Sequence, residues 1–559
     1  MSSYFMSTMG IPSYFSYIIK NYSNIIRSFT NVKTDMDRFH YLFMDCNSII
    51  YDAFRTLETT CPELLNSHDE LEARIIQDVI QKISEYIRYI SPSVTAYIAF
   101  DGVAPFAKMD QQRNRRYKGG VLHRMDMHVK QTIGDKKPGW STSNITPGTN
   151  FMKKLGERVS TAFKGLETHY GVKQIVVSAS DECGEGEHKM FHSMRTCRVQ
   201  TNETCAVYGL DSDLIMLSVF HCKLFRNIFI FRETPEFGQQ FLPNDLETSG
   251  GDKTCLFMDI EVLTRAILSE MQCGVSDPHR IYDYVFLCFF LGNDFLPHFP
   301  SLNIRTTGID TLLDAYRQHL GKYPERFFIS RDMQIQWKWV STFIAHLAKY
   351  EHSRLLSEYD LREKWSRRKW LVESEKDRDF TLQSAPVVMR AEELYICPQE
   401  RFWEQRYYNT LFHEHHNPKD VSLNYLQGLQ WVFSYYTRGC VDWKWKYNYH
   451  YPPLLADLTK HTPANDHDFF KNVQSEPFSP HVQLAYVLPK QSFGLLPPIV
   501  RDDLLHKWPE YSVDEFPFQW AFCRYFWEAH AILPTVPMDV LQLWEKEWTV
   551  KPRKIRAKK

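Results

Sequence analysis

The segment RFHYLFMDCN (residues 38–47) contains a short apolar run that ends in an acidic residue, Asp45. The same pattern recurs in VTAYIAFDG (94–102), KQIVVSASDE (173–182) and ETCAVYGLDSD (203–213). Helical patterns separate these runs, an alternation typical of an α/β domain with a largely parallel sheet. Open α/β sheets bind their ligands beyond the carboxyl ends of the strands. The sequence therefore predicts an acidic site at one edge of the sheet.

Two further segments add acidic residues to this set. LGNDFLPHFP (291–300) follows the helix-like run DYVFLCFFL (283–291), and GEGEH (184–188) places glycines beside two glutamates ahead of a helical pattern. Glycine permits tight turns and close backbone approach. The candidate site residues are the carboxylates Asp45, Asp101, Glu185, Glu187, Asp211, Asp213 and Asp294.

So many carboxylates in one cleft would repel each other unless protons or divalent cations neutralise them. Hard oxygen ligands suit Mg²⁺ or Mn²⁺. Two such ions about 3.5–4 Å apart can activate water and stabilise the leaving oxygen during phosphodiester cleavage. A single acidic pair is more often a helix cap or a solvated turn. Because the acidic ending recurs in five segments, the metal site is the better interpretation.

The segment FAKMDQQRNRRYK (106–118) directly follows Asp101. Helical spacing puts Lys108, Gln112, Arg115 and Arg116 on one face. That spacing alone also fits a solvated surface. Its position beside the predicted metal site favours an anion-binding role instead.

The composition limits the classes of protein to which the chain can belong. The chain has 559 residues, 43% of them hydrophobic, and a formal net charge of −1, so polyanion binding requires a local patch. The 12 cysteines include no CxxC pair, which indicates a reducing compartment. The longest apolar run, VFLCFFL, is too short to cross a membrane. We expect a soluble, cytoplasmic protein, with a nuclear one as the alternative.

The chain divides into regions by composition. Residues 1–345 carry the α/β pattern, 346–400 form a charged connecting segment with some helix, and 401–550 are helical and rich in aromatic residues. The last nine residues, KPRKIRAKK (551–559), form a basic tail suited to RNA affinity, nuclear import or solubility.

A series of motifs resembles the signature series of the XRN family of 5′→3′ exoribonucleases, in the same order. They are MGIPSYF (9–15), FMDCNSIIYDAF (43–54), AFDGVAPFAKMDQQRNRRYK (99–118), ITPGTNFM (145–152), GEGEHKM (184–190), VYGLDSDLIML (207–217) and LGNDFLPHFP (291–300). WVFSYYTRGCVDWKWKYNYHYPPLLADL (431–458) and FGLLPP (493–498) resemble the second conserved region of that family. The resemblance covers nearly the whole chain from Met9 to about residue 550.

The resemblance implies a nuclease core of the PIN/flap-endonuclease type, completed by the second region. It implies two Mg²⁺ ions, with Mn²⁺ as a substitute, held by the seven carboxylates. It further implies processive 5′→3′ hydrolysis of single-stranded RNA with a 5′ monophosphate to nucleoside monophosphates, in mRNA decay. Lys108, Gln112, Arg115 and Arg116 take the places of the family's 5′-phosphate pocket. We expect a monomer.

Several positions depart from the family pattern. Tyr51 stands where a stacking histidine is common, and a tyrosine can still stack on a base. Trp443 and Trp445 both fit the family's stacking tryptophan. The chain starts eight residues before the usual Met-Gly start at Met9, and it ends soon after the second region.

Two other functional classes remain as alternatives. One is a flap-type or DNA-directed 5′ nuclease with the same metal site, which predicts a preference for forked duplex DNA. The other is a non-catalytic binder of RNA 5′ ends, and the complete set of acidic residues disfavours it.

Overall fold

The computed structural model describes residues 13–36, 38–129, 140–197, 202–209, 212–233, 255–368, 372–412 and 417–549. Asp211, the Met-Gly start at Met9 and the basic tail lie outside these ranges. Within them, no helix combines the length and the hydropathy that crossing a membrane requires.

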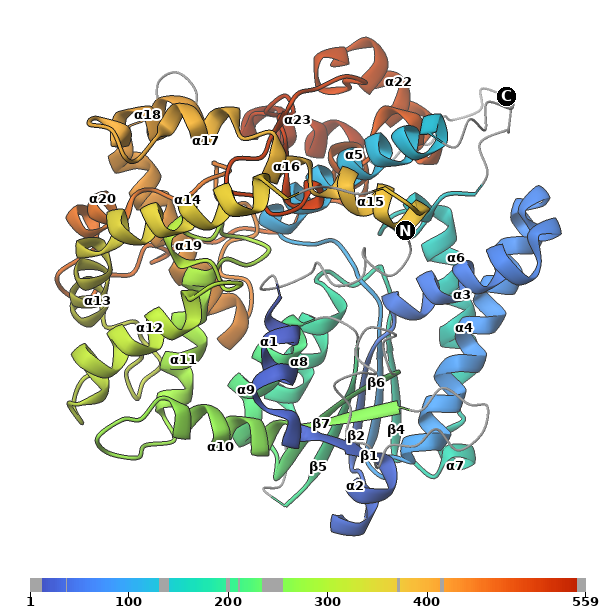
Figure 1. Cartoon of the computed structure of the whole chain (residues 1–559). Coiled ribbons are helices and arrows are strands. Elements are labelled where there is room, and N and C mark those ends of the chain that lie inside the picture. Colours follow the sequence, from blue (N-terminus) through green and yellow to red (C-terminus); the bar gives the residue numbers. More distant parts are fainter. Residues whose placement is uncertain are drawn as a thin grey trace.

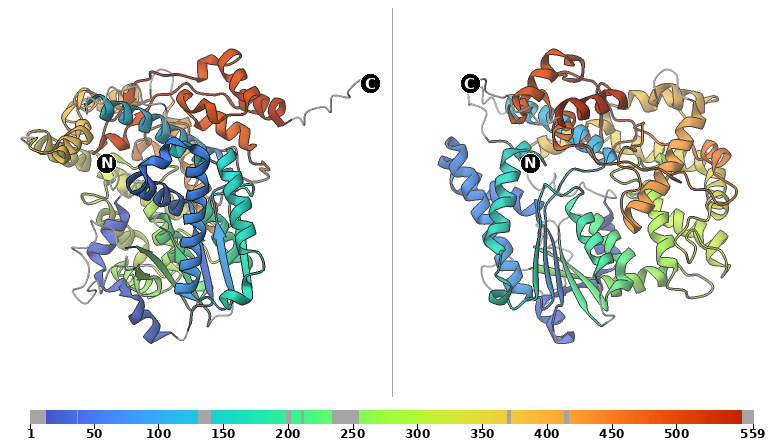
Figure 2. Two further views of the ribbon diagram at one scale, coloured as in Figure 1. Left: turned by 90° about the vertical axis from the view of Figure 1, so that its right-hand side faces the viewer. Right: turned by 180° about the vertical axis from the view of Figure 1, so that it is seen from behind.

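A seven-stranded sheet organises the first half of the chain (Figures 1 and 2). Its order is β1-β7-β6-β5-β2-β3-β4, in which β6 to β4 run parallel and the β7 pairings with β6 and β1 are antiparallel. The strands are β1 (Ile26–Ser28), β2 (Tyr41–Asp45), β3 (Thr95–Ala99), β4 (Gln174–Ser178), β5 (Thr204–Tyr208), β6 (Asn227–Glu233) and β7 (Cys255–Asp259). The prediction of an α/β fold with a mainly parallel sheet is confirmed.

Both faces of the sheet are buried by helices. Successive side chains of a strand point to opposite faces, so Tyr41 and Phe43 of β2 join one apolar cluster and Leu42 and Met44 join another. Helices α3, α4 and α6 cover one face, and α8 to α11 cover the other (Figure 1). The helices of this half are α1 (Tyr14–Asn21), α2 (Phe29–Asp35), α3 (Asn47–Thr60), α4 (His68–Ile90), α5 (Phe106–Val129), α6 (Asn150–Phe163), α7 (Glu167–Tyr170), α8 (Gly186–Thr196), α9 (Asp213–His221), α10 (Ile260–Glu270) and α11 (Arg280–Cys288).

The second half is helical apart from a small two-stranded sheet, β8 (Phe518–Gln519) with β9 (His530–Ala531). Its helices are α12 (Gly308–Tyr316), α13 (Trp337–Lys349), α14 (Glu351–Ser366), α15 (Glu375–Gln383), α16 (Ala385–Val388), α17 (Ala391–Ile396), α18 (Trp403–Leu411), α19 (Pro418–Thr437), α20 (Leu455–His461), α21 (Pro480–Val487), α22 (Pro498–His506) and α23 (Met538–Thr549).

The charged segment 346–400 packs against the rest of the helical half. It contains the whole of α14 to α17, and some of its charged side chains are buried. The guanidinium of Arg362 pairs with the Glu393 carboxylate at 2.5 Å and also donates to the carbonyl of Cys523 at 3.0 Å. These contacts connect α14 and α17 to a loop near the carboxyl end of the chain, so the segment does more than connect two regions.

Helix α5 links the two halves. It starts five residues after Asp101 and runs against the last helices of the chain (Figure 1). Its first turns bury Phe106 and Met109 in a cluster with residues of α21 and α23. The opposite face of α5 therefore faces the carboxyl edge of the sheet.

Gly148 marks a second contact between the halves. Its φ is +94°, and a Cβ there would lie 2.8 Å from the Cβ of Pro480 in α21. Gly165 also has a positive φ, +74°, but an added Cβ would meet nothing within 4 Å. Gly148→Ala should combine backbone strain with overpacking, whereas Gly165→Ala should show strain alone. We expect Gly148→Ala to be less stable than Gly165→Ala by about 1–3 kcal/mol in urea unfolding. Equal losses would contradict close packing of α21 on residue 148.

Candidate active site

Several of the predicted carboxylates lie at or shortly after the ends of strands of the sheet. Asp45 is the last residue of β2, and Asp101 follows β3 by two residues. Glu185 is the N-cap of α8, and Asp213 is the first residue of α9, which follows β5. Since β5, β2 and β3 are neighbours in the sheet, their crossovers meet at one edge. The fold thus brings together residues that are far apart in sequence.

Gly186 forms the floor of this acidic site. Its backbone N–H donates to Asp101 Oδ1 at 2.7 Å, and a Cβ at this position would lie only 2.7 Å from Asp45 Oδ1. The glycine of the GEGEH motif is therefore needed, because the Asp101 carboxylate accepts from its backbone N–H and the Asp45 carboxylate leaves no space for a Cβ. They lie at the N-terminus of α8, where the helix dipole favours negative charge.

Asn47 holds Asp101 from the side of α3. Its Nδ2 donates to Asp101 Oδ2, and its Oδ1 accepts from the backbone N–H of Asp101 at 3.1 Å. Sequence reasoning missed this residue. The available signal was the position of an amide side chain two residues after Asp45, but no spacing rule connects it to residue 101.

Lys108 contacts two of the predicted metal ligands. Its Nζ lies 2.6 Å from Glu185 Oε1 and 2.7 Å from Asp294 Oδ2, and all three side chains are buried to about the same degree. Lys108 was predicted to lie in the phosphate pocket. The structure places its ammonium group among the carboxylates, at the foot of α5. Its role in a phosphate pocket stays a prediction.

Glu187 and His188 complete the acidic site from the first turn of α8. His188 Nε2 lies 3.7 Å from Glu187 Oε1, and burial lowers the pKa of His188 well below its usual value. The imidazole is therefore neutral at pH 7. Ligand atoms of Glu185, Glu187 and His188 lie within 4.8 Å of one another, a spacing that could hold a metal ion.

The electrostatics of the site fit a divalent cation. Burial, followed by the neighbouring Glu185, raises the pKa of Asp101, while the Gly186 N–H and Lys108 oppose this effect. A buried carboxyl group beside a second carboxylate ionises more readily when a cation is bound nearby. The donors are mostly hard oxygen atoms, which Mg²⁺ prefers. The residues present therefore fit a site for a divalent metal ion.

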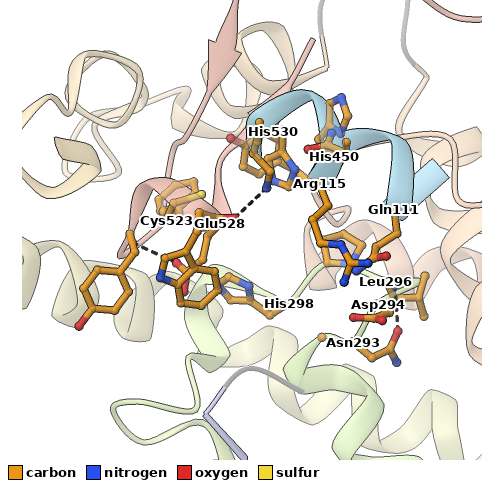
Figure 3. Close-up of a pocket in the computed structure, with 18 of the residues that line it drawn as sticks. Gln111, Arg115, Asn293, Asp294, Leu296, His298, His450, Cys523, Glu528 and His530 are labelled. Carbon is orange, nitrogen blue, oxygen red and sulfur yellow. Dashed lines mark hydrogen bonds between the residues drawn. The ribbon is translucent and has the colours of Figure 1, made fainter. Parts of the chain in front are cut away.

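Beyond Lys108, the predicted phosphate-pocket residues of α5 differ in exposure and in their neighbours. Gln112 is buried, whereas Arg115 and Arg116 are partly exposed. Arg116 interacts electrostatically with Tyr51 of α3, and burial of its guanidinium lowers its pKa to about 10. Arg115 points into a cavity that Asp294 and Gln111 also line (Figure 3). The two arginines therefore flank α5 on different sides.

This cavity has a volume of about 550 Å³ and lies between α5, the 291–305 loop and the segments around 450 and 525. His298, His450 and His530 lie on its wall (Figure 3). Burial lowers the pKa of His298 to about 4. Because it reaches Asp294, the cavity adjoins the acidic site.

The two candidate stacking tryptophans have different surroundings. Trp445 is only 8% exposed, and its ring stacks on Trp431 with centroids 5.1 Å apart. Trp443 is partly exposed, and its carbonyl accepts from the Phe106 N–H at 3.0 Å, at the start of α5. Trp445 is thus a core residue, and Trp443 is the one with accessible surface.

Two protein-family models match successive parts of the chain. A family described as XRN 5′-3′ exonuclease N-terminus matches residues 9–234, and one described as Xrn1 helical domain matches residues 276–395 and 396–551. The chain is 25% identical to 5′-3′ exoribonuclease 2 of Debaryomyces hansenii, covering 97% of the chain and 70% of that relative. It is 26% identical to 5′-3′ exoribonuclease 1 of Saccharomyces cerevisiae, covering 88% of the chain and 40% of that relative. It is 27% identical to 5′-3′ exoribonuclease 2 of Gallus gallus, in an alignment that covers 94% of the chain and 69% of that relative.

Proposed function

The chain belongs to the XRN family of 5′→3′ exoribonucleases, and we propose that it hydrolyses single-stranded RNA with a 5′ monophosphate, one nucleotide at a time, in RNA turnover. The observation that carries this proposal is the Lys108 ammonium group, which lies 2.6 Å from Glu185 and 2.7 Å from Asp294 at the foot of α5. One helix thereby joins an acidic, metal-suited site to a row of phosphate-binding side chains.

Metal binding falls to the acidic residues at the sheet edge. Asp45, Asp101, Glu185, Glu187, Asp213 and Asp294 would hold two Mg²⁺ ions, with Asp211 as the seventh ligand predicted from the sequence. Bound there, the ions would supply an activated water and offset the charge on the departing oxygen. The Gly186 N–H and Asn47 hold the Asp101 carboxylate in a fixed orientation.

Recognition of the 5′ end falls to α5. Lys108 and Gln112 lie at its foot, and Arg116 offers a planar set of N–H donors beside Tyr51. Guanidinium groups make charge-assisted, bidentate hydrogen bonds to phosphate. We propose that these groups bind the terminal monophosphate, with Tyr51 and Trp443 stacking on the first bases. The first phosphodiester bond would then lie over the carboxylates.

The proposal predicts a strict order of substrates. RNAs that differ only in the 5′ group should be degraded in the order monophosphate, then hydroxyl, then triphosphate, because a closed pocket has no room for the larger group. EDTA should stop the reaction and Mg²⁺ should restore it. A time course on 3′-end-labelled RNAs, with product mononucleotides resolved on a gel, measures both effects.

The same experiment separates the alternatives. Equal rates on 5′-triphosphate and 5′-monophosphate RNA would contradict the phosphate pocket. Faster cleavage of forked duplex DNA than of RNA would favour a flap-type nuclease. Tight binding of 5′-monophosphate RNA without degradation at any Mg²⁺ concentration would favour a non-catalytic binder.

A further inference from the structure

The last turns of α19 bring two consecutive tyrosines, Tyr435 and Tyr436, to the acidic site. Both are 2% exposed. Helix α19 belongs to the second half of the chain, some 250 residues from the carboxylates it meets. It packs beside α8, α9 and α11 on the inner side of the molecule (Figure 1). The helical half thus contributes directly to the surroundings of the predicted metal ligands.

Tyr435 holds the carboxylate of Glu185. Its hydroxyl donates to Glu185 Oε2 at 2.7 Å, while the other oxygen of that carboxylate, Oε1, forms an ion pair with the Lys108 ammonium group. Each oxygen of Glu185 therefore has one donor, and together they fix the plane of the carboxylate. This geometry does not follow from the backbone of the GEGEH loop alone.

The ring of Tyr435 is itself held in place by stacking. It lies against His188 with centroids 3.5 Å apart at 23°, and against Trp431 at 4.8 Å and 28°. Trp431 donates its indole N–H to the carbonyl of Asp442 at 2.8 Å and stacks on Trp445. Stacked aromatic rings in a close-packed core have little freedom to turn. The hydroxyl of Tyr435 is thus presented from a rigid support.

Tyr436 lies near three further carboxylates. Burial, together with the nearby charges of Asp213, Glu187 and Asp294, raises the pKa of its hydroxyl well above the usual value. Its ring packs edge-on against Phe289 at 5.4 Å. Tyr435 is thus the residue of this helix whose hydrogen bond to a predicted metal ligand is defined by its geometry.

We propose that Tyr435 is a positioning residue, which sets the orientation of the Glu185 carboxylate and thereby the affinity of the site for divalent cations. The inference rests on the proposed metal-dependent activity. Hydrogen-bond partners of metal-bound carboxylates typically change metal affinity by about 10–100-fold when they are removed. Divalent-cation affinity is thus a property of both halves of the fold, not of the sheet edge alone.

The test is the Mn²⁺ affinity of Tyr435→Phe without RNA, measured by titration calorimetry on the full chain. The change removes one hydroxyl and leaves the stacked ring, so we expect binding about 10-fold weaker or more. Exonuclease activity should need correspondingly more Mg²⁺ and recover at saturation. Tyr407→Phe is the matched control, because Tyr407 is 1% exposed and its hydroxyl donates to the Pro452 carbonyl at 2.9 Å in the core around α18.

A double-mutant cycle with Glu185→Gln shows whether Tyr435 acts through Glu185. The loss of Mn²⁺ affinity from Tyr435→Phe should shrink to less than about twofold when Glu185→Gln is already present, because residues in one hydrogen-bond network are not additive. A folded Tyr435→Phe variant with unchanged Mn²⁺ affinity, or a loss equal to that of Tyr407→Phe, would overturn the inference. If the unsubstituted chain binds Mn²⁺ but degrades no RNA, the proposed function fails while the positioning role still stands.

Discussion

Glu187→Gln is expected to lower the rate of RNA degradation by about 10³-fold or more, while RNA binding changes by less than about twofold. Glu187 is 6% exposed, in the first turn of α8, and its oxygen lies close to ligand atoms of Glu185 and His188. The amide keeps the shape of the side chain but replaces an anionic oxygen with an N–H donor. Since a tenfold rate change corresponds to about 1.4 kcal/mol, this loss is about 4 kcal/mol of transition-state stabilisation.

Single-turnover kinetics with end-labelled RNA measure this effect, and filter binding measures affinity. Glu182→Gln is a suitable control, since Glu182 is exposed in the loop that leads to α8, and its hydrogen bond with Ser178 can be kept by an amide. It should leave the rate unchanged. A Glu187→Gln enzyme that keeps more than a tenth of the original rate would show that Glu187 is not a metal ligand.

The location of the site could be predicted from the sequence because it follows from strand ends. Strands β2, β3 and β5 are almost entirely buried and β4, at the sheet edge, is half-buried, and acidic residues stand at or just beyond the end of each. In contrast, β1, β6 and β7 were not predicted. Strand β1 has only three residues, whereas β6 and β7 do end in acidic residues, Glu233 and Asp259. The Asp259 carboxylate caps α10 by accepting from the Val262 N–H, so an acidic strand end alone does not distinguish a site residue from a helix cap.

The supporting contacts could not be predicted, because they join residues distant in the chain. Asn47, after β2, reaches Asp101 at the end of the neighbouring strand β3, and Tyr435 reaches Glu185 from the other half of the fold. No periodicity in the sequence encodes such pairs. The choice between Trp443 and Trp445 depends likewise on burial, which only the packing of Trp431 against Trp445 reveals.

Helical spacing also does not show that the four predicted phosphate-pocket residues of α5 have different neighbours. Positions 108, 112, 115 and 116 share one side of an ideal helix, but a side spans a wide arc, and different neighbours occupy its two flanks. Asp294 and the cavity lie toward Arg115, whereas α3 lies toward Arg116. Lys108 pairs with carboxylates at the foot of the helix. The four residues are therefore not interchangeable, and their substitutions should have different effects.

Arg116→Ala is expected to reduce the preference for 5′-monophosphate over 5′-hydroxyl RNA by about 10–100-fold in kcat/KM. A hydrogen bond to a charged group contributes about 1.5–3 kcal/mol, which sets this range. Overall RNA affinity should fall by less than about threefold, because the remaining phosphates bind elsewhere. Arg116→Lys should be intermediate, since it keeps the charge but loses the planar set of donors.

Arg124→Ala supplies the control for this prediction, because Arg124 is exposed two turns further along the same helix. It removes the same charge from α5 at a distance from Tyr51, so the 5′-monophosphate preference should be unchanged. If both variants lost preference equally, the effect would be a general attraction of RNA to a basic helix. A selective loss in Arg116→Ala would instead mean that one guanidinium, desolvated between α3 and α5, recognises the terminal phosphate.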